Sequence, residues 1–363
     1  MSRIEAIRGE RQIVPGDAST TGSPVEGTNS RALDQWRGLA LICVLVSHGF
    51  YFTNRVHGFG RVGVNLFFFI SGILVYRSLA KKPELTSAAR SFSFWKSRLR
   101  RLYPAMLGYA IAMTPVAYLM QTRERSLPLP DFKDYVASLP LALACVMNYA
   151  RGMPMALGHL WSISCEMQFY LVAPLVFMAG GGNARRKNLI WIGLLGLLSL
   201  LGIAQPLVGD SVKYHFEFAV WPMMLGFFCE YQKPLFGTLP QRPIKWIVRF
   251  ALALFVISSV AMLATGRFKN IVIALGAVMF VPCFGSYVTG RNLKGRPGNF
   301  LAWIGARTYS IYLWQQPLTI CRYLPNFLHP VGAVAAIGLG AVWFNLLERP
   351  FLSPKRQKSS SGA

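Results

Sequence analysis

Acidic residues are scarce in this chain of 363 residues, which has 14 Asp and Glu against 38 Lys and Arg. All charged residues together make up only 14% of the chain, and hydrophobic residues make up 53%. This low charge argues against two soluble domains, which the length alone would permit. Apolar runs near the length that crosses about 30 Å of hydrocarbon recur along the sequence, so we predict an all-α, polytopic membrane protein.

The sequence also lacks the spacing patterns of a metal site and of a cleavable signal peptide. The cysteines occur singly, with no CxxC or Cys/His spacing, so we predict buried hydrophobic thiols and no metal site. They are Cys43, Cys145, Cys165, Cys229, Cys283 and Cys321. No short apolar core with a cleavage site precedes the first apolar run, so we expect no cleavable signal peptide. Residues 1–30 are polar, and we expect a disordered tail.

The net charge of +24 first points to nucleic acid or anionic lipid. The basic residues are spread over many short loops, which is typical of topology signals in a membrane protein, so we expect a lipid bilayer and no nucleic acid as partner. The candidate spans are residues 38–54, 62–80, 103–121, 158–179, 189–207, 216–233, 247–265, 270–288, 300–322 and 330–347.

Residues 135–149 form a further apolar segment, which is short and interrupted by Pro140. If this segment does not cross, about ten spans place roughly two-thirds of the basic residues on one side, together with both termini. The positive-inside rule therefore favours cytoplasmic termini. It makes residues 122–157 an external loop that contains a re-entrant or surface helix.

Arg37 and His48 are the ionisable residues at the two ends of the first span. Eleven residues separate them, which is about 20° from three full helical turns and about 16 Å of rise. Both side chains therefore share one helix face, with Arg37 at the cytoplasmic mouth and His48 near mid-membrane. Two interpretations stay open: a basic anchor with a structural histidine, or a functional site in which His48 acts as a general base.

Arg98 and Arg101 stand three residues apart before Pro104, which suits the opening turn of a helix. Two guanidinium groups at a membrane mouth can hold phosphates through bidentate hydrogen bonds. Spacing alone, however, favours anchoring by positive charge.

Glu166 is a carboxylate within an otherwise apolar span, and Ser162 and Tyr170 lie four residues to either side of it. The three side chains form a polar stripe on one helix face. Glu166 is predicted to orient the imidazole of His48 if it faces that residue or Arg37, as carboxylates do in catalytic triads. The alternative is an ion pair that holds two helices together.

Two further spans carry interior polar groups. Span 62–80 has Asn65 and Ser71, and its Gly60, Gly63 and Gly72 allow close backbone approach. Span 300–322 places phenols and amides before a kinking Pro317. These are Tyr309, Tyr312, Gln315 and Gln316. They are expected either to line the path of a hydroxyl-rich substrate or to form hydrogen bonds between helices.

Taken in order, these segments resemble the acyltransferase-3 family of integral-membrane O-acyltransferases. The resemblance rests on RALDQWRGLALICVLVSH, GRVGVNLFFFISG, RLRRLYP, HLWSISCEMQFY, YSIYLWQQP and LERP. It covers residues 31–351 and divides the chain into a tail over 1–30, a transmembrane acyltransferase domain over 31–351 and a basic tail over 352–363.

The resemblance implies ten spans and transfer of an acyl group, usually acetyl from acetyl-CoA, to a hydroxyl of an extracytoplasmic glycan at the inner membrane. It makes His48 the catalytic base, with Arg37 and Glu166 as functional partners, and Arg98 and Arg101 the donor-binding pair. No permanently bound cofactor is expected. The polar residues expected along the substrate path are Asn65, Ser71, Trp161, Ser162, Tyr170, Tyr309 and Gln316.

Two departures from the family pattern matter. Gln315 stands where many members carry His, so a titrating role there is not expected. No SGNH-type hydrolase domain follows the last span, so any second transfer step is expected to need a separate extracytoplasmic protein. The acceptor stays open among lipopolysaccharide O-antigen, exopolysaccharide, a lipid-linked oligosaccharide and a macrolide-like small molecule. A polytopic transporter or flippase of a glycan or lipid is the competing class.

Overall fold

A computed structural model describes residues 24–50, 57–81, 86–123, 132–179, 184–209, 212–234, 279–320 and 328–352. All regular structure in these ranges is helical, which confirms the all-α prediction. The predicted span 247–265, residues 270–278 of the span 270–288, Cys321 and most of both predicted tails lie outside the described residues.

The described ranges contain the following helices in chain order. They are α1 (Pro24–Gly49), α2 (His57–Ala80), α3 (Ser87–Arg123), α4 (Phe132–Leu143), the 3-10 helix η2 (Met147–Tyr149), α5 (Leu160–Ala179), α6 (Ala184–Val208), α7 (Phe216–Ala219), α8 (Trp221–Tyr231), α12 (Phe280–Thr289), α13 (Gly295–Ala306), α14 (Thr308–Thr319), α15 (His329–Trp343), the π-helical turn η5 (Phe344–Glu348) and the 3-10 turn η6 (Arg349–Phe351).

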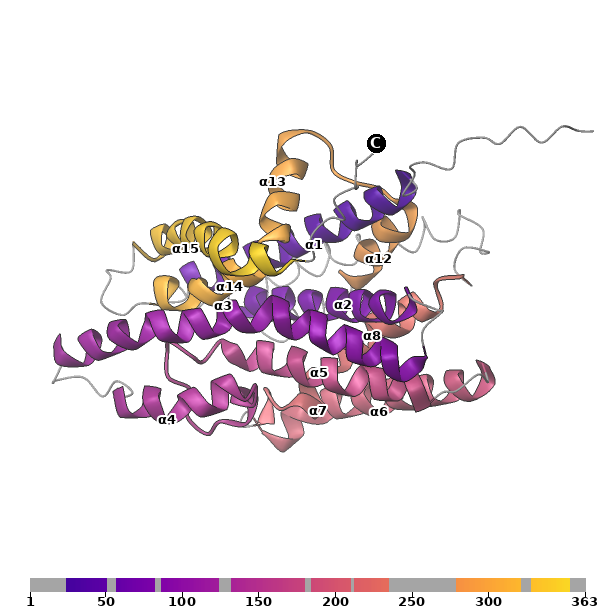
Figure 1. Ribbon diagram of the computed structural model, residues 1–363, viewed down its shortest axis with the longest axis horizontal. Helices are drawn as coiled ribbons and strands as arrows, with labels where there is room; N and C mark the ends of the chain where they lie inside the picture. The colour runs from indigo at the N-terminus through magenta and orange to yellow at the C-terminus, as the bar shows by residue number, and fades with distance from the viewer. Residues whose placement is uncertain are drawn as a thin grey trace, which may run out of the picture.

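Helix α1 occupies the centre of the bundle, because it contacts α2, α12, α13, α14 and α15. The long helix α3 crosses the molecule, with α5 running beside it, and α13 is turned steeply against the other helices (Figure 1). Arg37 and His48 both belong to α1, so the predicted rise of about 16 Å between them holds for this continuous helix.

Close contact between α2 and α8 depends on glycine. A Cβ at Gly72 of α2 would overlap the carbonyl oxygen of Met223, and a Cβ at Gly226 of α8 would overlap the carbonyl oxygen of Phe69. Each helix therefore presents a glycine to the backbone of the other, as small residues do where membrane helices approach closely. This contact fixes α2, which contributes Ser71 to the site described below.

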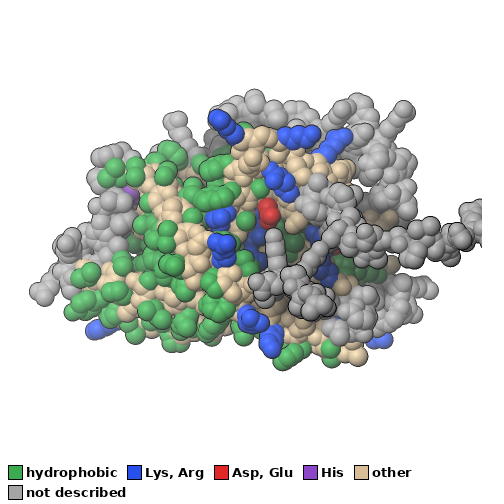
Figure 2. All heavy atoms as spheres, turned by 45° about the horizontal axis from the view of Figure 1, so that its top comes forward, with side chains coloured by type: hydrophobic (Ala, Val, Ile, Leu, Met, Phe, Trp, Pro, Cys, Tyr) green, Lys and Arg blue, Asp and Glu red, His purple; other side chains and the backbone are tan. Residues whose placement is uncertain are grey.

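The described part of the chain includes four helices that are long and apolar enough to cross a membrane. They cover Phe59–Ala80, Ala88–Leu119, Leu160–Met178 and His329–Phe351. Large apolar side chains such as Ile111 (64% exposed), Leu200 (66%) and Val334 (69%) point away from the bundle. Broad hydrophobic areas also flank a basic central region on one face (Figure 2). Exposed apolar area of this extent fits a lipid environment, and the ten-span count stays a prediction.

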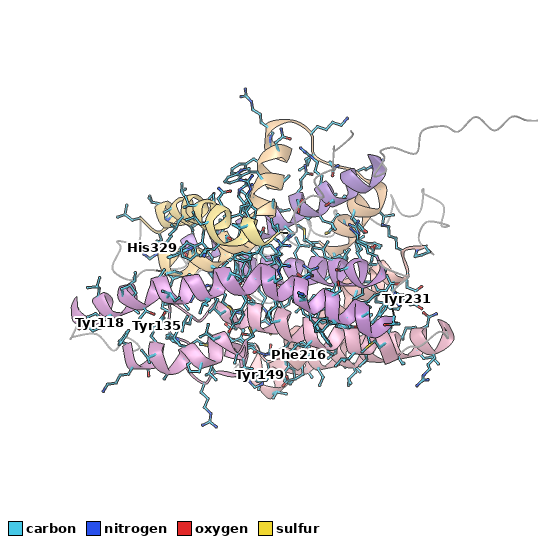
Figure 3. All side chains as sticks on the ribbon, in the orientation of Figure 1. Tyr118, Tyr135, Tyr149, Phe216, Tyr231 and His329 are labelled. Carbon is cyan, nitrogen blue, oxygen red and sulfur yellow. The ribbon has the colours of Figure 1, made fainter. Side chains whose placement is uncertain are left out.

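The segment predicted not to cross forms the short helix α4, whose 12 residues extend about 18 Å, less than the hydrocarbon thickness. Tyr135 of α4 donates a hydrogen bond to the carbonyl oxygen of Ala110 at 2.8 Å, and the rings of Phe132 and Tyr118 lie 5.5 Å apart. Tyr118 and Tyr135 mark one end of the molecule and Tyr231 the opposite end (Figure 3). Helix α4 is thus attached along the last turns of α3.

Several predicted boundaries were wrong. Helix α1 begins at Pro24, inside the segment predicted as a disordered tail. Pro104 lies in the interior of α3 and does not open a helix, because α3 already begins at Ser87 and takes in most of the basic loop. The predicted span 300–322 is divided at Arg307 into α13 and α14, and 216–233 is divided at Val220 into α7 and α8.

Candidate active site

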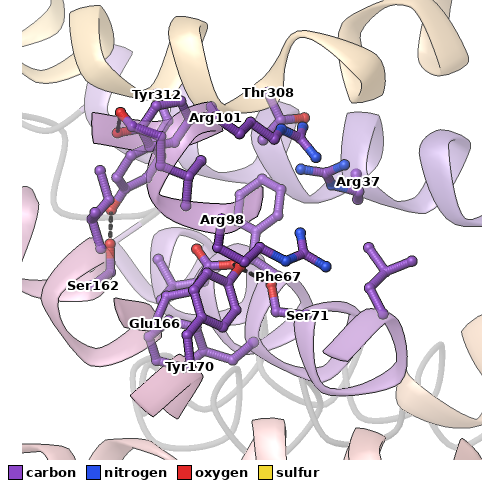
Figure 4. Close-up of a pocket in the computed structure, with 16 residues that line it drawn as sticks. Arg37, Phe67, Ser71, Arg98, Arg101, Ser162, Glu166, Tyr170, Thr308 and Tyr312 are labelled. Atoms are coloured by element: carbon purple, nitrogen blue, oxygen red, sulfur yellow. Dashed lines mark hydrogen bonds between the residues drawn. The ribbon is translucent and has the colours of Figure 1, made fainter. Parts of the chain in front are cut away.

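A pocket of about 710 Å³, part of it open at its mouth, lies between α1, α2, α3, α5 and α14. We call it the arginine pocket. Eight of the residues predicted as functional line it: Arg37, Ser71, Arg98, Arg101, Ser162, Glu166, Tyr170 and Tyr309. These come from five helices far apart in the sequence, and their side chains converge in the close-up (Figure 4).

Glu166 is held in the arginine pocket by two hydroxyl donors. Ser71 donates to its Oε1 atom at 2.6 Å, and Tyr170 donates to the same oxygen. The second oxygen, Oε2, has no hydrogen-bond partner among the described residues, so it can accept a hydrogen bond from a ligand. Glu166 shares the arginine pocket with Arg37, one of the two residues that it was expected to face. Its two hydroxyl donors lie on its own helix and on α2, so no described hydrogen bond joins it to His48, and its predicted role in orienting that imidazole stays a prediction.

The three arginines of the arginine pocket differ in how their charge is balanced. Arg101 donates from Nε and Nη2 to Oε1 of Glu348, at 3.1 and 3.0 Å. Arg37 lies 4.0 Å from Asp34, a long contact with a carboxylate that is 35% exposed. Burial raises the pKa of Asp34, although Arg37 and Arg101 act to lower it.

Arg98 has no carboxylate within ion-pair distance in the described ranges. Its guanidinium lies over the rings of Phe94 and Tyr170, 5.2 Å from each centroid, and its buried Nε has no hydrogen-bond partner. With the Arg101–Glu348 pair set aside, Arg37 and Arg98 face one lining glutamate, so the arginine pocket has an excess of positive charge. It is therefore suited to an anionic ligand, to which Arg98 can donate hydrogen bonds.

His48 does not line the arginine pocket. Its Nδ1 atom forms a hydrogen bond with Oε1 of Gln315 on α14. An amide oxygen only accepts hydrogen bonds, so this contact places the proton of the neutral imidazole on Nδ1 and its lone pair on Nε2. Gln315 is fully buried. A neutral amide is thus one hydrogen-bond partner of His48.

Tyr312 connects the two regions. Its side chain lines the arginine pocket, and its hydroxyl lies 2.7 Å from the hydroxyl of Ser162. Its ring is also 5.7 Å from the imidazole of His159. We call His48, Gln315 and His159 the His48 corner, and Tyr312 stands between this corner and the arginine pocket.

Three other predicted residues lie outside the arginine pocket. Asn65 is buried on α2. Trp161 packs behind the lining residue Phe68, with ring centroids 6.1 Å apart. Gln316 donates to the carbonyl oxygen of Met155 at 2.9 Å and so attaches the turn before α5 to α14. Trp161 therefore packs against a residue that lines the pocket, and Gln316 joins two segments that carry lining residues.

Sequence reasoning missed the role of Glu348 and did not identify the partner of Gln315. Glu348 is fully buried and accepts from Arg101 and, on Oε2, from Ser310 at 2.8 Å. Its place in the LERP motif was a usable signal, because an acidic residue is rare in this chain. Gln315 was expected either to line a substrate path or to form a hydrogen bond between helices, and its bond to His48 of α1 confirms the second alternative. The choice of His48 as partner depends on the contact of α14 with α1, which spacing does not reveal.

The model of the acyltransferase-3 family, described as an acyltransferase domain, matches residues 30–347. O-acetyltransferase OatA of Staphylococcus aureus (strain NCTC 8325 / PS 47) is 26% identical over 79% of this chain and 50% of its own length. Peptidoglycan O-acetyltransferase OatA of Listeria monocytogenes is 27% identical over 79% and 49%. The putative peptidoglycan O-acetyltransferase YrhL of Bacillus subtilis is 25% identical over 79% and 48%.

The chain spans about half the length of the curated relatives that it matches. No solved structure matches it significantly. The family match covers most of the helical bundle, including every residue of the arginine pocket and of the His48 corner. The chain therefore belongs to the acyltransferase-3 family.

Proposed function

We propose that the protein is a membrane-embedded O-acyltransferase that moves an acetyl group from cytoplasmic acetyl-CoA to a hydroxyl of a cell-surface glycan. The observation that supports this most is the arginine pocket beside α1, the helix that also carries His48. A site for a multiply charged donor and a potential base then share one rigid helix. Family membership favours this activity over a transporter.

The donor enters with its nucleotide at the mouth of the arginine pocket. Arg98 contacts the phosphates together with Arg37, since neither forms a close ion pair with a described carboxylate. The thin pantetheine arm then extends along α1 toward His48, about 16 Å beyond Arg37. In this arrangement the phosphates stay near water while the thioester reaches the bilayer interior.

His48 acts as the general base. Its Nε2 lone pair removes the proton of the acceptor hydroxyl as the oxygen bonds to the thioester carbonyl carbon. The carbon–sulfur bond then breaks, and the leaving thiolate takes the proton back from the imidazolium. The products are an acetyl ester and free coenzyme A. General base catalysis of this kind typically contributes about 10²–10⁴-fold to the rate.

The acceptor is a glycan hydroxyl on the far side of the cytoplasmic membrane. Two of the relatives carry peptidoglycan in their names, which makes peptidoglycan the first acceptor to test, ahead of O-antigen and exopolysaccharide.

The test uses the full chain in lipid nanodiscs with radiolabelled acetyl-CoA and separate glycan acceptors. The readouts are labelled ester on the glycan and release of free thiol. We expect ester formation by the wild type and a loss of about 10²–10⁴-fold in kcat for His48→Ala. His215→Ala is the matched control, because His215 lies away from both regions, beside Tyr149 and Glu217.

Wild-type activity in His48→Ala would overturn the assignment of the base. A wild type that forms no ester with any glycan and releases no thiol would overturn the proposed function itself.

A further inference from the structure

Buried nitrogen atoms whose hydrogen bonds are incomplete lie near His48. The Nε2 atom of Gln315 and both ring nitrogens of His159 form no well-aligned hydrogen bond with the described residues, and the His159 ring has only a weaker contact with the backbone of Leu313. The exposed fraction is 0% for Gln315 and 2% for His159. Buried polar groups are almost always satisfied, and leaving one unsatisfied costs about 1–3 kcal/mol. Two such side chains in one corner therefore indicate a place where a ligand atom completes the hydrogen bonds.

The packing of His159 directs it at this corner. Its ring is wedged between Tyr109 of α3, at 5.6 Å, and Tyr312 of α14, at 5.7 Å. It is also close enough to His48 for the two imidazoles to interact electrostatically. Because Tyr312 and Gln315 are three residues apart on α14, they share one helix face. The ring of Tyr312 that His159 packs against and the Gln315 amide that binds His48 thus lie on the same side of α14.

The chemistry of these groups defines the ligand atom. The Gln315 oxygen is occupied by His48, so its amide offers only N–H donors, and a neutral imidazole offers one more. Two donors beside a base suit an oxygen with two lone pairs. They do not suit a metal ion or an ammonium group. In attack on a thioester, the carbonyl oxygen fits this description, because it gains negative charge as the new bond forms.

We propose that Gln315 Nε2 and the His159 imidazole bind the carbonyl oxygen of the acyl group and stabilise the negative charge that it develops. This inference rests on the proposed function and adds catalytic residues to it. Gln315 then has two tasks: its oxygen fixes the tautomer of His48, and its nitrogen donates to the carbonyl oxygen. Removing one such donor typically lowers kcat about 10²–10³-fold.

Gln315→Glu separates the two tasks. The carboxylate still accepts from Nδ1 of His48, but it has lost the N–H donor. We expect kcat to fall about 10²-fold while the KM for acetyl-CoA changes little, since the lost contact strengthens only in the transition state. Gln205→Glu is the matched control, because the Gln205 amide donates to the carbonyl oxygen of Gly209, away from the site.

His159→Phe keeps a flat ring between Tyr109 and Tyr312 but removes the donor, and His159→Asn restores a side-chain N–H. We expect kcat to fall at least tenfold in His159→Phe and to recover in part in His159→Asn. This pair provides a second test if Gln315→Glu does not fold.

The kcat values are measured from ester formation across pH, with thermal unfolding as a check on folding. Wild-type or higher kcat in folded Gln315→Glu, or equal kcat in His159→Phe and His159→Asn, would overturn the inference and leave the proposed function intact. A wild type without ester formation would reject the proposed function instead.

Discussion

The arginine pocket and the His48 corner lie on the same helix, α1, but they satisfy their polar groups in opposite ways. In the arginine pocket, carboxylates, hydroxyls and aromatic rings already contact the charged groups, as the Arg101–Glu348 pair and the Ser71–Glu166 bond show. In the His48 corner no carboxylate contact is seen among the described residues, and the nitrogen atoms Gln315 Nε2 and those of the His159 ring form no well-aligned hydrogen bond there.

This difference assigns ligand binding to the arginine pocket and the chemical reaction to the His48 corner. A permanently charged part of a ligand needs a site whose charges are fixed before it arrives, and the arginine pocket provides this. A charge that appears only during reaction is best met by oriented dipoles that carry no net charge, because these do not favour the ground state. The contrast can be tested by removing single contacts from each region.

The largest effect on folding is expected from Glu348→Gln. This change keeps the shape of the side chain but removes the negative charge that balances Arg101. Breaking a buried ion pair on one side costs about 3–5 kcal/mol. We expect about 3 kcal/mol here, because the Arg101 side chain remains 24% exposed. The measurement is the midpoint of thermal unfolding in detergent, which should fall by several degrees.

Glu217→Gln is the control for Glu348→Gln. Glu217 pairs with His215 at 3.4 Å and is 40% exposed, so its loss should cost less than about 1 kcal/mol. The double variant Arg101→Met, Glu348→Met should recover much of the lost stability, since it leaves no buried charge. An unchanged midpoint in Glu348→Gln would show that Arg101 does not depend on this carboxylate.

Arg98→Ala should weaken donor binding more than it slows chemistry. Arg98 keeps an unsatisfied Nε and lies over two aromatic rings, so it is preorganised for phosphate. We expect the KM for acetyl-CoA to rise about tenfold, with a smaller rise in Arg98→Lys, which keeps the charge but not the planar fork. The KM of the wild type should also rise more steeply with salt than that of Arg98→Ala.

Arg186→Ala removes an exposed arginine at the start of α6 and serves as the control, with no change expected. If Arg98→Ala kept the wild-type KM and lost only kcat, the arginine pocket would be part of the reaction centre, and its separation from the His48 corner would be wrong.

Much of this arrangement could be predicted from the sequence, because charge is rare in an apolar chain and each charged residue is informative. The stripe of Ser162, Glu166 and Tyr170 and the pair Arg98 and Arg101 follow from helical spacing, and all five side chains line the arginine pocket. The close approach of α2 to α8 follows from Gly72, because the backbone of Met223 occupies the space that a Cβ would need.

Contacts between helices could not be predicted in the same way. Spacing gives the face of a residue within its own helix, but it does not give the rotation of that helix against its neighbours. Glu166 and His48 were therefore paired as the two obvious ionisable groups, whereas the structure pairs His48 with Gln315 and Glu166 with Ser71. The break at Arg307 was missed because apolar composition alone does not distinguish one long helix from two short ones.

The smallest effect is expected from Ser71→Ala, which tests how firmly Glu166 must be held. Ser71 contributes one of two donors to Oε1, and Tyr170 keeps the other. Losing one hydrogen bond of this kind costs about 1 kcal/mol, so kcat/KM should fall about fivefold. Ser97→Ala, which removes only a bond to the carbonyl oxygen of Phe94 within α3, is the control. A fall as large as that of Gln315→Glu would mean that Glu166 takes part in the transition state, and the arginine pocket would then not be a binding region alone.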